Sequence, residues 1–122
     1  MDSHSHSERF PKRLRLTRQR EFDRVFRSRR VARDSILVVH CAANGFPDSR
    51  LGISASRRLG NAVVRNTWKR LIREAFRRQQ SQLPGGLDFV VRPQTGAVPD
   101  LVSVARSLAT LARKLHRKES GT

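Results

Sequence analysis

Apolar residues recur with a helical period near the start of the chain and with a strand-like pattern directly after it. Phe22, Val25 and Phe26 are spaced i, i+3 and i+4 in the stretch TRQREFDRVFRS, which predicts a short amphipathic helix with Thr17 as its N-cap. The next stretch, RVARDSILVVHCAAN, is apolar and rich in β-branched residues. It therefore predicts one strand, or two short strands around Asp34.

A further strand and a long helix follow. The stretch RLGISAS alternates larger apolar residues with glycine and serine, which predicts a strand with one packed face and one smooth face of small side chains. Asn61 is a suitable N-cap for the long helix, and LPGG at 83–86 ends it. At about 100° per residue, this helix has an apolar side and a cationic side. The apolar side holds Val64, Trp68, Leu71, Ile72, Ala75 and Phe76, and the cationic side holds Arg65, Lys69, Arg70, Arg73 and Arg77.

The rest of the chain predicts one more strand, LDFVVRP, and one more helix at residues 100–118, where apolar residues recur at helical spacing. The order α-β-β-β-α-β-α predicts an α+β fold, a small two-layer sandwich with helices packed on one sheet. We divide the chain into a mobile basic arm at residues 1–15, a single domain at residues 16–118 and a C-terminal tail at residues 119–122.

The charge of the chain indicates a polyanionic partner. Lysine and arginine total 26 against 10 acidic residues, which gives a net charge of +16 and a pI near 11.9. All but four of these cations are arginines, whose planar guanidinium groups match phosphate oxygens and stack on bases. On the long helix, Arg65, Lys69 and Arg73 form a row of like charges, which Arg57 and Arg58 extend towards the helix N-terminus. We therefore expect nucleic acid to bind here.

Catalytic and metal-binding arrangements are scarce in the sequence. The acidic residues are scattered, and no Walker-type glycine loop, nucleophile elbow or zinc-ligand spacing is present. His40 and His116 are better explained as structural or solvated residues than as general bases. His4 and His6 have no further ligand nearby, so we expect neither a metal site nor a catalytic residue on the protein itself.

Cysteine content and hydropathy bear on the compartment. Cys41, the one cysteine, lies inside an apolar run, which predicts a small buried side chain in a reducing environment. The apolar runs are far shorter than the roughly 20 residues that a membrane helix requires. We expect a soluble, cytoplasmic protein without a membrane partner or an obligate protein partner.

The stretch SRRLGNAVVRNTWKRLIREAF resembles the signature of the protein subunits of bacterial ribonuclease P, which runs from a basic pair through Gly-Asn-Ala-Val, Arg-Asn and Lys-Arg to Arg-Glu-Ala-Phe. LGISAS and REFDRVF resemble the strand before that helix and the first helix of the family, and the match runs in order from Leu14 to Pro93. Two residues depart from the family pattern. Thr67 replaces the last arginine of an Arg-Asn-Arg core, and Trp68 stands where a smaller aliphatic residue is commoner.

The resemblance implies a left-handed β-α-β crossover around the long helix. It also implies an enzyme that removes the 5′ leader of precursor tRNA, in which a large RNA with magnesium ions is the catalyst and the protein is an inactive cofactor when alone. The partners would then be ribonuclease P RNA and precursor tRNA. The implied contacts with the catalytic RNA are Arg65, Asn66, Lys69, Arg70 and Arg73, with Arg57 and Arg58 compensating for Thr67. The implied cleft for the leader is formed by Phe22, Phe26, Leu37 and Val39.

Two alternatives come from other classes of protein. A structural RNA-binding protein, such as a ribosomal protein or an RNA chaperone, would use the same basic helix without a leader cleft. From composition alone, Phe22 and Phe26 are better explained as the core face of their helix, so their exposure in a groove distinguishes the two functions. A nuclease acting by itself would need clustered carboxylates or histidines, which the sequence does not offer.

Overall fold

A computed structural model describes residues 10–120, and within these residues the predicted α+β class and the order of its elements are confirmed. The α-helices are α2 (Gln19–Arg27), α3 (Ala62–Gln79) and α4 (Leu101–Ser120). The strands are β1 (Arg30–Arg33), β2 (Leu37–Ala43), β3 (Arg50–Ile53) and β4 (Leu87–Pro93). The short 3-10 helices are η1 (Lys12–Leu14), η2 (Arg57–Leu59) and η3 (Gln80–Gln82).

The four strands form one sheet in the order β1-β2-β4-β3. β2 runs antiparallel to β1 and to β4, whereas β3 and β4 are parallel neighbours, so α3 is the crossover between them. Part of the β3 edge is covered, because the backbone N–H of Leu16 donates to the carbonyl of Leu51 at 2.8 Å. Covering an edge strand in this way removes a template for pairing with another chain.

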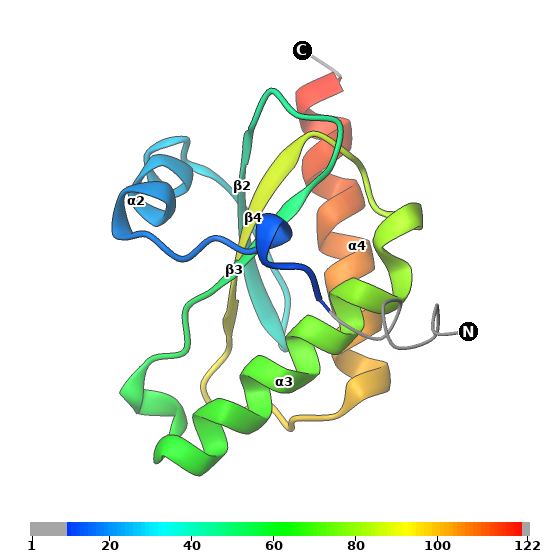
Figure 1. Ribbon diagram of the computed structural model, residues 1–122. Helices are drawn as coiled ribbons and strands as arrows, with labels where there is room; N and C mark the ends of the chain where they lie inside the picture. Colours follow the sequence, from blue (N-terminus) through cyan, green and yellow to red (C-terminus); the bar gives the residue numbers. More distant parts are fainter. Residues whose placement is uncertain (1–9, 121–122) are drawn as a thin grey trace, which may run out of the picture.

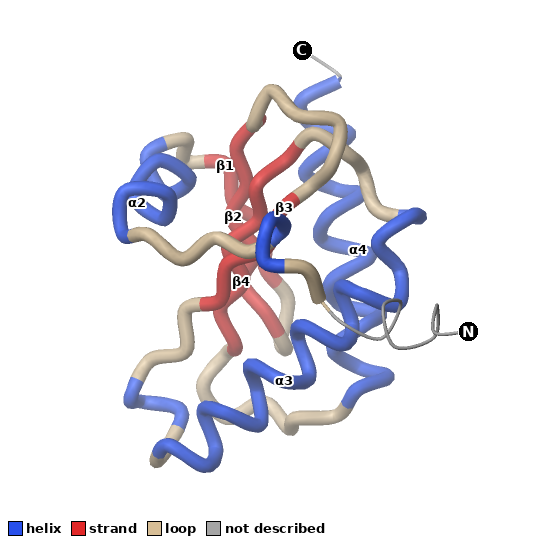
Figure 2. Tube along the Cα trace, viewed as in Figure 1, coloured by secondary structure: helices blue, strands red, loops and turns tan. Residues whose placement is uncertain are grey.

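The helices divide between the two faces of the sheet. α2 packs on one face, and α3 and α4 lie on the other (Figures 1 and 2). We call the sheet face that α2 covers the α2-side face. The strand register shows that alternate residues of the two central strands, β2 and β4, point to this face. These residues are Val38, His40 and Ala42 of β2, and Asp88, Val90 and Arg92 of β4.

The main core lies between the sheet and the helices α3 and α4. Phe89 and Val91 from β4 meet Trp68, Ile72 and Phe76 from α3 in this core, and all five are buried. A smaller cluster lies on the α2-side face. Its buried members are Leu16, Val25, Ala42 and Val90, with Phe22 and Phe26 packed against it.

The N-terminal boundary of the domain lies earlier than the sequence predicted. Phe10 and Leu14 are buried in the main core, and the ring of Phe10 meets that of Phe76 edge to face with centroids 5.5 Å apart. Residues 10–15 therefore belong to the domain, because two large apolar side chains are buried there. The remainder of the expected arm, with His4 and His6, lies outside the described residues.

The C-terminal boundary also differs from the prediction. α4 continues to Ser120, so the tail expected from residue 119 begins with helical residues. Among residues 10–120, the helices lack an apolar stretch long enough to cross a membrane.

One of the two predicted N-caps is confirmed. The side chain of Asn61 accepts a hydrogen bond from the backbone N–H of Val64 at 3.0 Å, as expected for the start of α3. Thr17 is not the N-cap of α2, which begins after Arg18. Instead, the Glu21 carboxylate accepts from the backbone N–H groups of Thr17 and Arg18, both at 3.0 Å. The acid in the first turn thus accepts from the backbone before the helix, as in a capping box, and no threonine hydroxyl caps α2.

A buried carboxylate joins α2 to the sheet. Asp88 has no exposed surface and accepts two hydrogen bonds from Arg50, at 2.8 and 2.7 Å, one from Asn44 at 2.9 Å, and one from Arg24 on α2. Arg24 also donates to the carbonyl of Ala43 at 2.9 Å. Burial opposes ionisation of Asp88, but the hydrogen bonds from Arg50, Asn44 and Arg24 outweigh it and lower its pKa below the ordinary value.

We expect Asp88→Asn to lower the free energy of unfolding by about 3 kcal/mol at neutral pH, because two arginines lose their charged partner. A depressed carboxylate pKa contributes stability above the unfolded-state pKa and loses it as the pH falls through the folded-state pKa. The difference between wild type and variant should therefore shrink in acid, as measured by urea unfolding across a pH series.

Asp48→Asn is the matched control. Asp48 pairs with Arg13 at 2.8 Å on the surface, where both side chains are at least half exposed, so its loss should cost less than about 1 kcal/mol. Equal losses in the two variants, or a difference that does not depend on pH, would contradict the role given to Asp88.

Candidate nucleic-acid interface

The outer side of α3 carries a row of cations that no acid neutralises. Arg65, Lys69 and Arg73 follow one another at intervals of about one helical turn. Arg65 and Lys69 are half-buried, and Arg73 is exposed. Within residues 10–120, these three side chains make no salt bridge. We call Arg65, Lys69 and Arg73 the α3 cationic row. Asn66 and Arg70 are exposed beside it, so the five α3 residues expected to contact RNA share one accessible surface.

Glu74, the one acidic residue of α3, pairs with arginines outside the α3 cationic row. Glu74 accepts from Arg77 at 2.7 and 3.1 Å and from Arg78 at 2.6 Å, near the C-terminal end of the helix. The hydrogen bonds from Arg77 and then Arg78 lower the pKa of Glu74 to about 2. Its charge therefore compensates the last turn of the helix and leaves the α3 cationic row positive.

The segment before α2 adds a cation to this row. Arg15 lines a hollow of about 170 Å³ together with Lys69 and Arg73. Burial, followed by the charge of Arg15, lowers the pKa of Arg73. Like charges held this close favour binding of an anion between them. Arg15 was not expected from the sequence, because its approach to α3 depends on the packing of residues 10–16.

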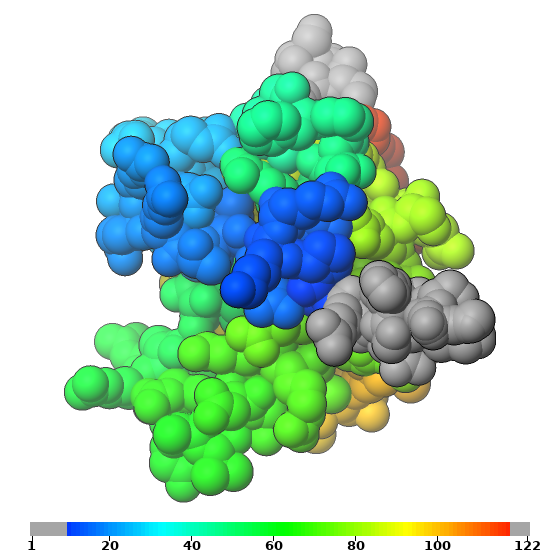
Figure 3. All heavy atoms as spheres, in the orientation of Figure 1, coloured from blue at the N-terminus to red at the C-terminus, as the bar shows by residue number. Residues whose placement is uncertain are grey.

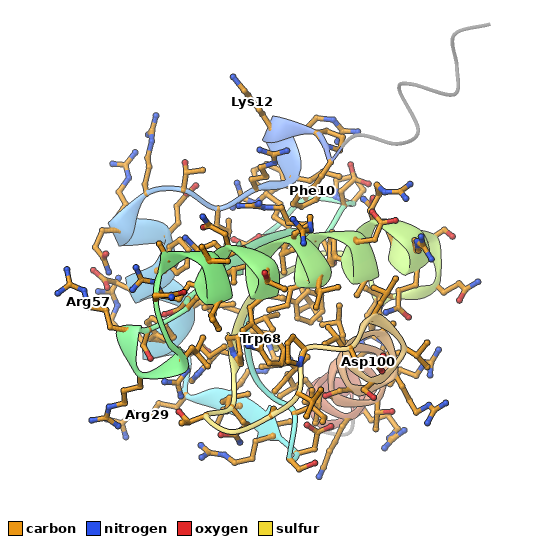
Figure 4. All side chains as sticks on the ribbon, turned by 90° about the horizontal axis from the view of Figure 1, so that it is seen from below. Phe10, Lys12, Arg29, Arg57, Trp68 and Asp100 are labelled. Atoms are coloured by element: carbon orange, nitrogen blue, oxygen red, sulfur yellow. The ribbon has the colours of Figure 1, made fainter. Side chains whose placement is uncertain are left out.

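Trp68 and Thr67, the two residues that depart from the family signature, both lie away from the most exposed side of α3. Trp68 is buried in the main core, on the side of α3 that faces the sheet (Figure 4). Thr67 is half-buried, and its hydroxyl donates to the carbonyl of Val63 at 3.0 Å. Neither side chain therefore interrupts the exposed cationic surface of α3.

Phe22 and Phe26 lie on the α2-side face, and both are half-buried. Phe22 packs over Gly52: a Cβ placed on that glycine would come within 2.8 Å of the ring. Phe26 meets the ring of His40 edge-on, with centroids 4.8 Å apart and planes at 88°. The two rings are thus neither free platforms nor fully buried core residues, and each keeps an accessible part.

The other two residues expected in a leader cleft lie elsewhere. Leu37 and Val39 have no exposed surface and belong to the main core, on the opposite face from Phe22 and Phe26. The expectation for these two residues is wrong by one position in the strand, because neighbouring residues of a strand point to opposite faces. Val38 and His40 are the β2 residues that share the α2-side face with the two phenylalanines.

A cationic hollow continues the α2-side face beyond α2. Arg33, Arg58 and Arg92 line it, with a cavity volume of about 210 Å³, and we call it the three-arginine pocket. It lies near the ends of β1, β3 and β4. On the face drawn in Figure 3, an indentation separates α2 (blue) from the segment that runs from η2 into α3 (green). Arg33 and Arg92 were not expected from the sequence, although an arginine inside an otherwise apolar strand such as LDFVVRP is a usable signal.

The basic pair before α3 divides between two surfaces. Arg58 lines the three-arginine pocket. Arg57 does not line it; its side chain is exposed near the N-terminal end of α3 (Figure 4). Only Arg57 thus extends the α3 surface in the manner expected from the sequence. In the described part of the chain, no group of three histidine, cysteine or acidic side chains could hold a metal ion.

The fold and these two surfaces define a small arginine-rich α+β protein whose exposed charge suits a polyanion. Residues 10–116 match the family model of ribonuclease P. The chain is 40% identical over 88 residues to the ribonuclease P protein component of Thermotoga maritima, covering 72% of this chain and 75% of that protein. It is 43% identical over 83 residues to the ribonuclease P protein component of Brevibacillus brevis, covering 67% of this chain and 66% of that protein.

Solved structures agree with the sequence comparisons. The ribonuclease P protein from Thermotoga maritima superposes with a TM-score of 0.75 at 35% identity, covering 82% of this chain and 96% of that one. The ribonuclease P protein of Staphylococcus aureus superposes with a TM-score of 0.73 at 30% identity, covering 83% of this chain and 94% of that one. The chain belongs to the bacterial ribonuclease P protein family. It is thus the protein component of a tRNA-processing ribonucleoprotein, and its partner is ribonuclease P RNA.

The close packing at Gly52 generates a prediction. Gly52→Ala places a methyl group against the Phe22 ring, so α2 should shift away from the sheet and the free energy of unfolding should fall by about 1–3 kcal/mol. The double variant Gly52→Ala, Phe22→Leu should recover part of this loss, because the clash is with the ring. Thermal unfolding of the four proteins of the cycle measures the coupling. Strictly additive losses would show that the ring is not the obstacle.

Proposed function

We propose that this protein assists ribonuclease P by binding two RNAs on two surfaces: the catalytic RNA on the α3 cationic row, and the 5′ leader of precursor tRNA on the α2-side face. The observation that carries the proposal is the difference between these surfaces. The first is a helical row of cations without acids, and the second combines two partly accessible phenylalanine rings with cations at its open end.

The α3 surface suits a folded RNA. Arg65, Lys69 and Arg73 are spaced along a rigid helix, so they can meet successive backbone phosphates and release counterions. Arg15 lines the same hollow as Lys69 and Arg73 and adds a further positive charge beside the row. Affinity for the catalytic RNA should therefore fall steeply as the salt concentration rises.

The α2-side face suits an unpaired strand. The accessible parts of Phe22 and Phe26 can stack on bases, which contributes about 1–3 kcal/mol per base without selecting a sequence. Mature tRNA has lost its leader, so this contact favours the precursor over the product. In this proposal the RNA holds the magnesium ions and supplies the catalysis, while the protein contributes binding and orientation.

A structural RNA-binding protein without a leader contact is the second candidate. The partial burial of Phe22 and Phe26 against Val90 and Ala42 is the observation that favours it. The leader-binding function accounts for more of the molecule, because it also explains why the same face carries a pocket of three arginines with no acidic residue among its described lining residues.

The test is cleavage of precursor tRNA by a bacterial ribonuclease P RNA at low magnesium concentration, with the protein, without it, and with the protein alone. We expect cleavage only when RNA and protein are both present. The double variant Lys69→Gln, Arg73→Gln should bind the RNA more weakly. Its slope of log affinity against log salt concentration should be shallower by about 1.8, which is about 0.9 for each lost phosphate contact.

Arg113→Gln removes an exposed arginine of α4 and is the control, for which we expect wild-type cleavage and salt dependence. A protein that binds the RNA but leaves the cleavage rate unchanged would contradict the cofactor function and favour the structural RNA-binding protein. Cleavage by the protein alone would contradict both.

A further inference from the structure

The three-arginine pocket is built by the sheet register. Arg33 of β1 and Arg92 of β4 are each paired with Val38 of β2, so the two arginines flank one valine across three neighbouring strands. Directly paired residues of antiparallel strands project from the same face. Val38 thus forms an apolar floor between two cations, and Arg58 from η2 lines the same pocket.

The positive charge of this pocket is not compensated. Within residues 10–120, the three arginines make no salt bridge, and no acidic residue lines the pocket. Asp34 follows Arg33 in the sequence, but its carboxylate accepts from the backbone N–H of Ile36 and from the hydroxyl of Ser107 on α4. That acid is therefore occupied at another place in the fold.

Two buried polar atoms, one in this pocket and one on the neighbouring part of the α2-side face, also have no partner in the described part of the chain. Nε of Arg92 and Nε2 of His40 are buried without a hydrogen bond within the described part of the chain. Burial, followed by the charges of Arg92 and Arg33, lowers the pKa of His40. Both arginines thus act on the same small region, where an anion would offset their repulsion.

We propose that the three-arginine pocket binds one backbone phosphate of the leader and thereby fixes the register of the leader on the α2-side face. This inference rests on the proposed function and adds to it a defined phosphate subsite. A phosphate fits because guanidinium groups bind its oxygens through paired hydrogen bonds, and the hydroxyls of Ser56 and Thr95 line the same pocket. The leader is the source because the pocket lies on the same sheet face as Phe22 and Phe26, joined to Phe26 through His40.

The experiment replaces leader phosphates, one at a time, by neutral methylphosphonates and measures the affinity of the assembled ribonucleoprotein for each precursor. One linkage should weaken binding by roughly tenfold in wild type, the change that a single charged hydrogen bond supports. The same linkage should have little further effect in Arg92→Gln and in Arg33→Gln. Because Arg33 is exposed, its variant tests the pocket even if Arg92→Gln fails to fold.

Arg113→Gln is again the control and should retain the full wild-type sensitivity at that linkage. If no single linkage matters while the leader still raises affinity over mature tRNA, the pocket proposal is wrong and the proposed function stands. If Arg92→Gln weakens mature tRNA and precursor equally, the pocket holds another phosphate and the proposal is also wrong. If the leader adds no affinity in wild type, the proposed function itself fails.

Discussion

The Asp88 carboxylate is the interaction on which the α2-side face depends. It is buried on β4 and accepts hydrogen bonds from Arg50 on β3, from Arg24 on α2, and from Asn44 after β2. The apolar side chains of α2, Phe22, Val25 and Phe26, pack on a small cluster only, so this charged connection adds a second, directional constraint on where the helix lies. The position of α2 in turn sets where Phe22 and Phe26 lie. A buried ion pair of this kind contributes more to a specific arrangement than to net stability.

The alternation of side chains along the strands separates the two surfaces of the molecule. On β2, Leu37, Val39 and Cys41 complete the main core beneath α3 and α4, whereas Val38 and His40 face the other way. The α3 cationic row is thus held by a large apolar core, and the α2-side face is held by polar contacts and a small cluster. In the proposed function, one sheet thus supports a helical surface for the catalytic RNA and a second surface, on its other face, for the leader.

Much of this architecture could be predicted from the sequence, because α3 and β3 carry clear periodicities. The apolar stripe of α3, its cap at Asn61 and its cationic side follow from residue spacing alone. The register of β2 could not be predicted, because the run SILVVHCAA is apolar at nearly every position and contains no alternation that identifies its faces. Arg33, Arg58 and Arg92 are far apart in the chain, so only the sheet brings them together.

The assignment of two RNAs to two surfaces can be tested by a tethered hydroxyl-radical probe. Cys41 is buried, so a cysteine introduced at the surface is the accessible thiol for the probe. Thr95→Cys places it at the three-arginine pocket, and Arg70→Cys places it beside the α3 cationic row; both positions are exposed. In the ribonucleoprotein bound to precursor tRNA, we expect the probe at residue 95 to cut the leader and the probe at residue 70 to cut the catalytic RNA. Cutting of the catalytic RNA alone from both positions would contradict the account.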